Sequence, residues 1–593
     1  MTRHLLALSL GPVQDFIAAA RRTRDLWFGS FLLSEVSKAA AGALADRGGL
    51  ESLIFPALEN LAELNDPQFN CANVILALLP EGIDPASCAS EARQKASERW
   101  KKFSDGAVQI AGNLIEDEIW KDQVGDVLEF YAAWVPLRSV QAYSEDRRRL
   151  MRLLAARKAC RDFKPARGLA QVPKSSLDGA RESVLKRGTK GSSRLPLAAG
   201  EQLDAVGLTK RVAGGQLPYP SVARVAASSW LKMTADSPAD AEGFLELKRE
   251  CERLAEEGIL SRVASAAFEA FPYEGTAVYL SRHQSLAEEA GKNKTDLQRL
   301  SDLVRQLTLK NGLGEPSPYL AILMADGDSM GATLSQLPSP EAHREFSKRL
   351  SSFATQARKV TAEVGGVCIY AGGDDVLALL PLDIALNGAR QLHDRFKSLL
   401  TGAGGLEHPP TLSVGVAVGH FMEPLEDLRD YARKAEKSAK QSSRLSTDMR
   451  FGERNGLAVH VHVRSGASLQ VRERWQPGED SLDRRLERWR GLFAIKGLPA
   501  KLPYDFRQLV SEYQHWPSGE SLRVALAADA RRVAGRKQLK LEKADLDWFQ
   551  ARLESLQSAK DLEEVADEML IAQWLAGGAG TAETSPGSEE VPA

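Results

Sequence analysis

The stretch that decides the fold is residues 369–380, which read IYAGGDDVLALL. Apolar residues run into and out of a tip of two glycines and two aspartates, a pattern that predicts a strand, a tight turn and a strand. Gly372 and Gly373 permit the positive φ values of a two-residue hairpin turn and let a large anion approach the backbone. Asp374 and Asp375 place two carboxylates together, which repel each other unless a cation lies between them. A hard divalent cation would fill this place, because it takes oxygen ligands and binds nucleotide phosphates.

A second acidic segment lies upstream of this hairpin. Residues 319–324 are an apolar run of strand length, followed by the sequence ADGDSMG with Asp326 and Asp328. Residues 339–363 have helical spacing of their apolar positions. The pattern from this segment to the hairpin is therefore strand, helix, strand, acidic turn and strand.

The same pattern continues after the hairpin. Residues 384–400 form a second helical stretch, and residues 410–418 alternate like a strand. The complete βαββαβ order is that of a ferredoxin-like domain. In that topology the third strand lies antiparallel beside the first, which brings four carboxylates to one edge of the sheet: Asp326, Asp328, Asp374 and Asp375. We interpret them as catalytic metal ligands of a two-metal site for Mg²⁺ or Mn²⁺.

The two acidic segments resemble the palm domain shared by diguanylate cyclases and CRISPR type III large subunits. Residues 8–30, LSLGPVQDFIAAARRTRDLWFGS, are similar to the opening of the first palm in the large subunit of type III-B (Cmr) effector complexes. Further similar segments follow in family order at residues 69–80, 200–211, 219–221 and 457–466. This resemblance implies a two-palm enzyme that condenses ATP, usually into cyclic oligoadenylate, when its complex detects target RNA. The implied partners are other Cmr subunits, CRISPR guide RNA and target RNA.

Composition is consistent with such a multidomain protein. The chain has 593 residues, more than one hydrophobic core usually serves, and a formal net charge of −2. That charge argues against a surface that binds nucleic acid everywhere, so RNA contacts are expected to be local. The five cysteines contain no CxxC pair, and no apolar stretch approaches the roughly 20 residues of a membrane span. We expect a cytoplasmic protein with no membrane partner.

We therefore predict an α+β protein with two ferredoxin-like palms and two helical domains. The expected domains are a degenerate first palm (1–138), a mainly helical intervening domain with a basic loop region (139–310), a catalytic second palm (311–466), a C-terminal helical domain (467–576) and a disordered tail (577–593). The first palm repeats the second, but its strand end at 9–11 and its turn at 69–73 contain no carboxylate pair. It is expected to hold the acceptor nucleotide. Helical spacing predicts a helix from residue 13 to about 46.

Further residues are candidates for contacts with nucleotide or RNA. Lys440 matches the lysine that cyclase-like palms place near the nucleotide phosphates, although it could also be an ordinary surface lysine. The nucleotide-binding candidates are Gly372, Gly373, Ser329, Gly331 and Lys440. Two arginine clusters fit either a solvated helix face or contacts with RNA phosphates. These RNA-contact candidates are Arg147, Arg148, Arg149, Arg152, Arg21, Arg22 and Arg24.

Two metal sites and one nuclease are not expected. Residues 203–208 lack the cysteines that relatives often use, so no structural zinc is predicted. His460 and His462 alternate on one strand, and without further ligands we interpret them as a solvated face. Many relatives begin with an HD nuclease domain, whereas this chain starts at the first palm and has His393-Asp394 as its His-Asp dipeptide. No HD nuclease activity is expected.

Two alternatives belong to other functional classes. A diguanylate-cyclase-like enzyme would use GTP, but the long N-terminal palm and the absence of a sensory or receiver segment argue against it. A non-catalytic scaffold of the guide-RNA complex would need no carboxylate cluster, whereas this chain keeps four carboxylates.

Overall fold

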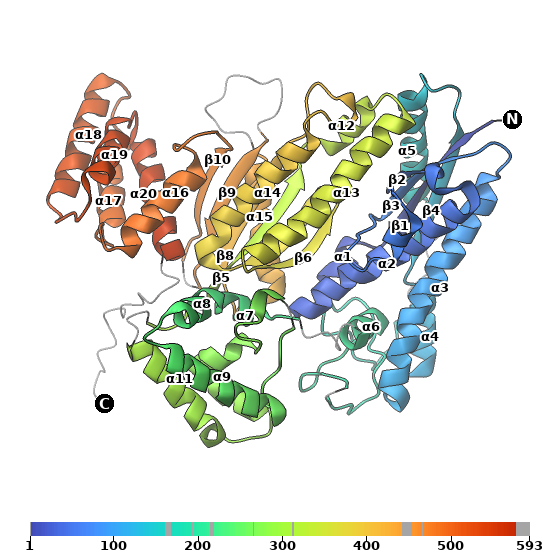
Figure 1. Cartoon of the computed structure of the whole chain (residues 1–593), viewed down its shortest axis with the longest axis horizontal. Coiled ribbons are helices and arrows are strands. Elements are labelled where there is room, and N and C mark those ends of the chain that lie inside the picture. Colours follow the sequence, from blue (N-terminus) through green and yellow to red (C-terminus); the bar gives the residue numbers. More distant parts are fainter. Residues whose placement is uncertain are drawn as a thin grey trace.

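The computed structural model describes residues 2–160, 168–192, 194–213, 219–264, 266–310, 314–441, 454–464 and 466–576. The structure contains two sheets covered by helices, one in the middle of Figure 1 and the other, in blue, at its right. The predicted tail at 577–593 lies outside the described residues. The mixed helix and sheet architecture with two ferredoxin-like units confirms the predicted fold class.

The first palm is built on a four-stranded sheet with the order β2-β3-β1-β4. Both neighbours of β1 run antiparallel to it, which is the ferredoxin-like arrangement. Helices α2 and α3 cover one face of the sheet, and α5 covers the other. The elements are β1 (His4–Gly11), α1 (Gln14–Ala18), α2 (Thr23–Gly48), β2 (Leu53–Phe55), β3 (Val74–Leu79), α3 (Pro85–Ala111), α4 (Asp117–Gly125), β4 (Glu129–Pro136) and α5 (Tyr143–Ala159).

The predicted continuous helix from residue 13 to 46 is wrong, because the structure divides it into α1 and α2. The buried ammonium group of Lys210 lies at the break. It donates hydrogen bonds to the carbonyl oxygens of Phe16 and Ala19, at 2.7 and 2.5 Å. A buried ammonium group needs such acceptors. Lys210, almost 200 residues away in the chain, thus bonds to two carbonyl oxygens that a continuous helix would have used for its own backbone hydrogen bonds.

The second palm carries the order β8-β5-β7-β6, extended by β9 and β10 to six strands. Strands β7 and β8 both run antiparallel to β5, as predicted, while β9 lies parallel to β8. Helices α13 and α14 cover one face, and α15 lies on the other. The elements are β5 (Tyr319–Gly327), α12 (Met330–Gln336), α13 (Pro340–Glu363), β6 (Val367–Gly372), β7 (Asp375–Leu380), α14 (Ala385–Leu400), β8 (Leu412–His420), α15 (Leu425–Ala439), β9 (Gly456–Val461) and β10 (Leu469–Arg474).

Helix α13 shows how local sequence sets this palm. Ser339 caps its N-terminus by accepting a hydrogen bond from the Ala342 backbone N–H, and Pro340 occupies the first turn. The predicted apolar positions are all buried: Phe346, Leu350, Phe353, Ala357 and Val360. The helix therefore packs one apolar stripe onto the sheet and leaves β5 and β7 to meet at their polar ends.

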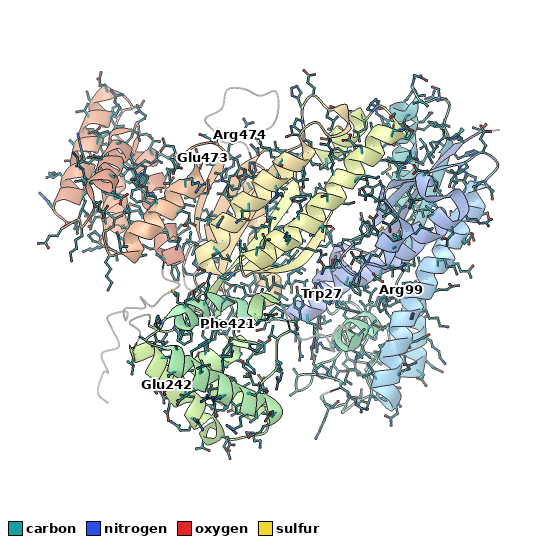
Figure 2. The ribbon with its side chains drawn as sticks, in the orientation of Figure 1. Trp27, Arg99, Glu242, Phe421, Glu473 and Arg474 are labelled. Atoms are coloured by element: carbon teal, nitrogen blue, oxygen red, sulfur yellow. The ribbon has the colours of Figure 1, made fainter. Side chains whose placement is uncertain are left out.

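Two groups of helices complete the chain. Between the palms lie α6 (Ala205–Ala213), α7 (Val222–Ala226), α8 (Ser228–Asp236), α9 (Ala241–Glu256), α10 (His283–Glu289) and α11 (Gln298–Lys310). After the second palm lie α16 (Leu482–Ala494), α17 (Leu502–Tyr513), α18 (Glu520–Gly535), α19 (Lys543–Glu554) and α20 (Ala559–Ala576). Trp27, labelled in Figure 2, packs against the cores of both the first palm and the intervening helices and stacks on Tyr219 at 5.2 Å between ring centroids.

The two palms touch each other directly. The Tyr143 hydroxyl on α5 lies 2.7 Å from Nδ1 of His343 on α13, and both residues are buried. Arg344 donates from Nε to the carbonyl oxygen of Leu53 on the edge strand β2. The backbone N–H of Ala57 donates to the Ser347 hydroxyl at 3.0 Å. The mutual orientation of the palms is therefore fixed by specific contacts as well as by apolar packing.

Candidate functional site

The acidic hairpin has the geometry that its sequence predicts. Gly372 on β6 pairs with Asp375 on β7, so Gly373 and Asp374 form a two-residue turn. Gly373 has φ of 68°, a conformation that strongly favours glycine. A Cβ on Gly372 would lie 2.4 Å from the Tyr370 hydroxyl oxygen, so this position also excludes larger residues. Gly373 is therefore required by the backbone of the turn, and Gly372 by the Tyr370 side chain packed beside it.

The end of β5 supports this turn from the neighbouring strand. A Cβ on Gly327 would lie 2.7 Å from Cβ of Asp374, so only a glycine lets the hairpin pack this closely. The Gly327 backbone N–H donates a hydrogen bond to the Asp374 carboxylate. The glycine between Asp326 and Asp328 thus brings the two acidic segments together.

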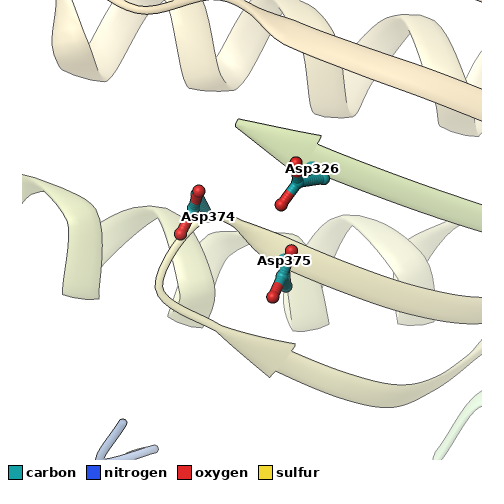
Figure 3. Close-up of side chains that lie close together, drawn as sticks. All are labelled: Asp326, Asp374 and Asp375. Carbon is teal, nitrogen blue, oxygen red and sulfur yellow. The ribbon is translucent and has the colours of Figure 1, made fainter. Parts of the chain in front are cut away.

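Three carboxylates meet at this edge of the sheet. Asp326, Asp374 and Asp375 each offer an oxygen within 4.8 Å of the other two, and Figure 3 shows them converging from β5 and the adjacent turn. The donors are hard oxygens, which is the ligand type that Mg²⁺ and Mn²⁺ prefer. The residues present therefore fit a divalent cation.

Electrostatics at this edge favour a cation. Loss of contact with water raises the pKa of Asp374 to about 6, with a further contribution from Asp328. Asp375 is more exposed, and partial desolvation together with repulsion from Asp374 and Glu436 raises its pKa to about 7. Each shift means that the protein disfavours the negative charge, and a bound cation would reverse that preference.

The structure places Asp328 apart from the other three carboxylates. Its side chain is 3% exposed and accepts hydrogen bonds from the hydroxyls of Thr411 and Ser413 and from the Asn455 backbone N–H, at 2.7 to 2.9 Å. Burial raises its pKa, and these hydrogen bonds oppose the shift. The carboxylate links the end of β5 to β8 and to residue 455, and its role as a metal ligand stays a prediction.

Lys440 lies directly at the carboxylate cluster. Its ammonium group contacts the Asp326 carboxylate and lies 2.6 Å from Oε1 of Glu436, one helical turn earlier on α15. Burial raises the pKa of Glu436, as does the nearby Asp328. Glu436 was not among the predicted site residues, although its position four residues before Lys440 on a helix is the spacing of an ion pair.

The other predicted nucleotide contacts surround the same edge. Ser329 is exposed, has φ of 57° and precedes α12. Gly331 in the first turn of α12 is exposed, and nothing lies within 4 Å of where its Cβ would be. Together with Gly372 and Gly373 they leave backbone accessible beside Asp326.

The predicted arginine clusters divide by exposure. On α5, Arg148, Arg149 and Arg152 are exposed, whereas Arg147 is 7% exposed and desolvation lowers its pKa. Arg21 is exposed at the break between α1 and α2, and Arg22 and Arg24 are half-buried there. The exposed members are available to an anionic partner, and RNA contact stays a prediction for all seven.

The interpretation of His460 and His462 as a solvated face is wrong. His460 is buried beneath α15, and His462 stacks on Tyr431 of that helix at 3.8 Å between ring centroids. Burial lowers the pKa of both residues to about 4. Alternation along β9 correctly placed them on one face, but helix α15 covers that face of the sheet.

The first palm approaches the acidic hairpin with its own turn. Asn70 donates from Nδ2 to the carbonyl oxygen of Ala371, two residues before the hairpin turn, at 2.5 Å. This contact joins the turn at 69–73 to β6 of the second palm. Sequence reasoning missed Asn70, because no local pattern indicates a partner 301 residues away.

Comparison with known protein families shows what the two palms are similar to. The family model described as Cas10/Cmr2, second palm domain, matches residues 319–447. The model described as CRISPR-associated protein Cmr2, N-terminal, matches residues 5–105. The chain therefore contains a segment similar to the second palm of Cas10/Cmr2 proteins and a segment similar to the Cmr2 N-terminal region. The resemblance read from the N-terminal motif and the acidic hairpin is thereby confirmed.

One curated relative and two solved structures extend this result. The CRISPR system Cmr subunit Cmr2 of Pyrococcus furiosus is 22% identical over 534 residues, which span 72% of this chain and 59% of the relative. The chain therefore spans less than two thirds of the length of that relative. The cryo-EM structure of type III-B Cmr-beta in the apo state matches with a TM-score of 0.68 at 14% identity, covering 98% of this chain and 82% of that one. Cmr-beta bound to cognate target RNA matches with 0.64 at 13% identity, covering 98% and 83%.

These structural likenesses show that the fold is shared. No helix in the described part of the chain is sufficiently long and apolar to cross a membrane.

Proposed function

We propose that this protein is the large subunit of a type III-B CRISPR effector complex and that it joins ATP molecules into cyclic oligoadenylate-type products when target RNA is bound. The observation that carries the proposal is the convergence of Asp326, Asp374 and Asp375 at the edge of the second palm. A structural hairpin needs no such cluster, because adjacent carboxylates destabilise one another without a cation. The similarity to the second palm of Cas10/Cmr2 proteins supports the choice of nucleotidyl transfer among metal-dependent reactions.

The proposed metal ligands are Asp326, Asp374 and Asp375, with Asp328 as the fourth predicted carboxylate. A divalent cation held there, Mg²⁺ or Mn²⁺, would lower the pKa of a ribose hydroxyl and offset charge on the leaving pyrophosphate. In the reaction the ribose hydroxyl oxygen bonds to the α-phosphorus of a second ATP. The bond between that phosphorus and the oxygen bridging to the β-phosphate breaks, and pyrophosphate leaves.

The remaining residues bind and orient the nucleotide. Gly372 and Gly373 leave room for the triphosphate beside the turn, and Ser329 and Gly331 offer exposed groups on the adjacent loop. Lys440 supplies a positive charge for a phosphate oxygen. Because Asn70 joins the first palm to β6, the turn at 69–73 is well placed to contact an acceptor nucleotide.

The proposed partners are other Cmr subunits, guide RNA and target RNA. The exposed arginines of α5 support a local RNA contact, since Arg148, Arg149 and Arg152 lie together on one helix. Phosphate contacts of this kind position RNA without reading its sequence.

The test is a product assay on the assembled complex. The complex, guide RNA and target RNA are incubated with labelled ATP and Mn²⁺, and products are resolved by mass spectrometry. We expect adenylate oligomers that disappear in an Asp374→Ala, Asp375→Ala double variant, while assembly is unchanged. Product from the double variant would overturn the site, whereas no product from the wild type with target RNA demonstrably bound would favour the scaffold.

A further inference from the structure

Helix α15 is seated unusually close to the sheet that carries the site. A Cβ on Gly415 of β8 would lie 2.1 Å from the Glu436 backbone nitrogen, and one on Gly456 of β9 would lie 2.2 Å from the Ala439 carbonyl oxygen. Real Cβ atoms do not approach this closely, so glycines at these strand positions set the height of the helix. The backbones of Glu436 and Lys440 are therefore held at a fixed place beside β5.

Two carboxylates share the ammonium group of Lys440. One belongs to Asp326, a member of the metal-fitting cluster, and the other to Glu436, which is not a member. Glu436 is 8% exposed and Lys440 is also largely withdrawn from water. A carboxylate and an ammonium group that are shielded from water attract each other more strongly than an exposed pair does.

We propose that Glu436 is a positioning residue that divides Lys440 between itself and Asp326, so that a metal ion can take Asp326 while the ammonium stays at the site. This inference rests on the proposed function and adds a residue to it. Lys440 and the metal compete for the same carboxylate. When the metal binds Asp326, Glu436 retains the ammonium one turn away, facing the place where a triphosphate is expected.

The two residues should therefore affect binding of the metal alone in opposite directions. Without Lys440, the Asp326 carboxylate loses the ammonium group that contacts it, and the metal binds more tightly. Without the Glu436 charge, Lys440 has Asp326 as its remaining carboxylate and the metal binds more weakly. A lysine that served solely as a phosphate partner would leave the affinity for free metal unchanged.

The test is to titrate the 593-residue protein with Mn²⁺ alone. Binding is measured by calorimetry and by the electron paramagnetic resonance signal of free Mn²⁺. We expect Lys440→Met to tighten Mn²⁺ binding about tenfold and Glu436→Gln to weaken it about tenfold, the scale of changes next to metal ligands. The double variant should bind Mn²⁺ with an affinity within about threefold of the Lys440→Met single variant, because Glu436 acts through Lys440. Binding of Mn²⁺-ATP should weaken in both single variants.

Three results would overturn the inference. Unchanged Mn²⁺ affinity in Lys440→Met shows that there is no competition. An equal loss from Glu436→Gln with and without Lys440 shows that Glu436 acts by its own charge. Absence of Mn²⁺ binding in the wild type overturns the proposed function as well, so the two failures are distinguishable. Lys437→Met, on the exposed side of α15, is the matched control. If Lys440→Met unfolds at a lower temperature than the wild type, Lys440→Gln takes its place.

Discussion

The two palms share one topology and differ at one edge. Ser9 pairs with Val74 in the first palm as Ala325 pairs with Val376 in the second. At the next position of the first palm, the Leu10 backbone N–H donates to the Asn73 carbonyl oxygen, whereas the second palm has Asp326 and Asp375 there, with carboxylate oxygens within 4.8 Å of each other.

Leu10 is 2% exposed and packs in the apolar core of its palm. At the corresponding place, Asp326 points toward two other carboxylates. The comparison teaches that a ferredoxin-like scaffold tolerates either an apolar or an acidic edge. The strand pairing is made by backbone hydrogen bonds, so the side chains at the strand ends are free to be specialised.

The largest expected effect contrasts the equivalent edges directly. Asp326→Asn should lower the rate of nucleotide product formation at least about 100-fold, because a charged ligand is replaced by a neutral amide. Asn73→Ala in the first palm should lower that rate by no more than about tenfold, since a contact near the acceptor nucleotide is shortened but no carboxylate ligand is lost. Product formation by the assembled complex is the measurement. An equal loss of rate in Asn73→Ala would show that the first palm takes part in the reaction as much as the second, and the two edges would not differ in function.

A stability measurement tests the apolar edge. Leu10→Asp should lower the free energy of unfolding by about 3–4 kcal/mol, because it removes core packing and buries an unpaired carboxylate. Asp326→Leu should change it by less than about 1 kcal/mol, since Asp326 is only half-buried and Lys440 keeps its contact with Glu436. Urea unfolding followed by tryptophan fluorescence provides both values. Similar values for the two variants would show that the edges are equivalent after all.

A smaller effect concerns the contact that joins the palms. Burial and the nearby guanidinium groups of Arg147 and Arg344 lower the pKa of His343 to about 3, whereas it is about 6.5 in the unfolded chain. The folded form therefore holds neutral His343, and its contribution to stability is complete above pH 6.5 and is lost as the pH falls toward 3. As the pH falls from 7 to 5, His343 alone should lower the free energy of unfolding by about 2 kcal/mol, because the unfolded chain binds the proton and the folded form does not.

His343→Gln should remove that part of the pH dependence, measured as the change in unfolding free energy between pH 7 and 5. His515→Gln, at an exposed histidine of the C-terminal helices, serves as the control and should behave as the wild type. If His343→Gln kept the full pH dependence, the contact with Tyr143 would not depend on a neutral imidazole. The palms would then be joined mainly by their apolar surfaces.

Local patterns predicted the elements and the acidic turn well. Apolar spacing found α13, and alternation found β8, because these patterns report burial on one face. Gly372 and Gly373 predicted a two-residue turn, and Gly373 with Asp374 forms it, since few residues other than glycine accept the positive φ at position 373. The antiparallel pairing of β5 and β7 followed from the order of elements, and it brought Asp326 to Asp374 and Asp375.

Contacts between distant segments were not predicted. The break between α1 and α2 depends on Lys210, and the burial of His460 depends on α15. Asn70 reaches Ala371 from the other palm, and Glu436 approaches Lys440 and Asp326 because glycines on two strands lower α15 onto the sheet. Apart from Glu436 and Lys440, which are four residues apart on one helix, each of these contacts joins residues whose separation along the chain carries no periodic signal.

The sequence by itself thus determined the two palms and the acidic hairpin, because strand alternation, helical spacing and glycine geometry are properties of neighbouring residues. The tertiary structure alone decided which carboxylates face one another. It placed Asp328 among hydroxyls and Asp326 beside Lys440, although the two aspartates are separated by a single glycine. The physical reason is that hydrogen-bond partners and desolvation come from whichever segments the fold brings within a few ångströms, and those segments are far apart in the chain.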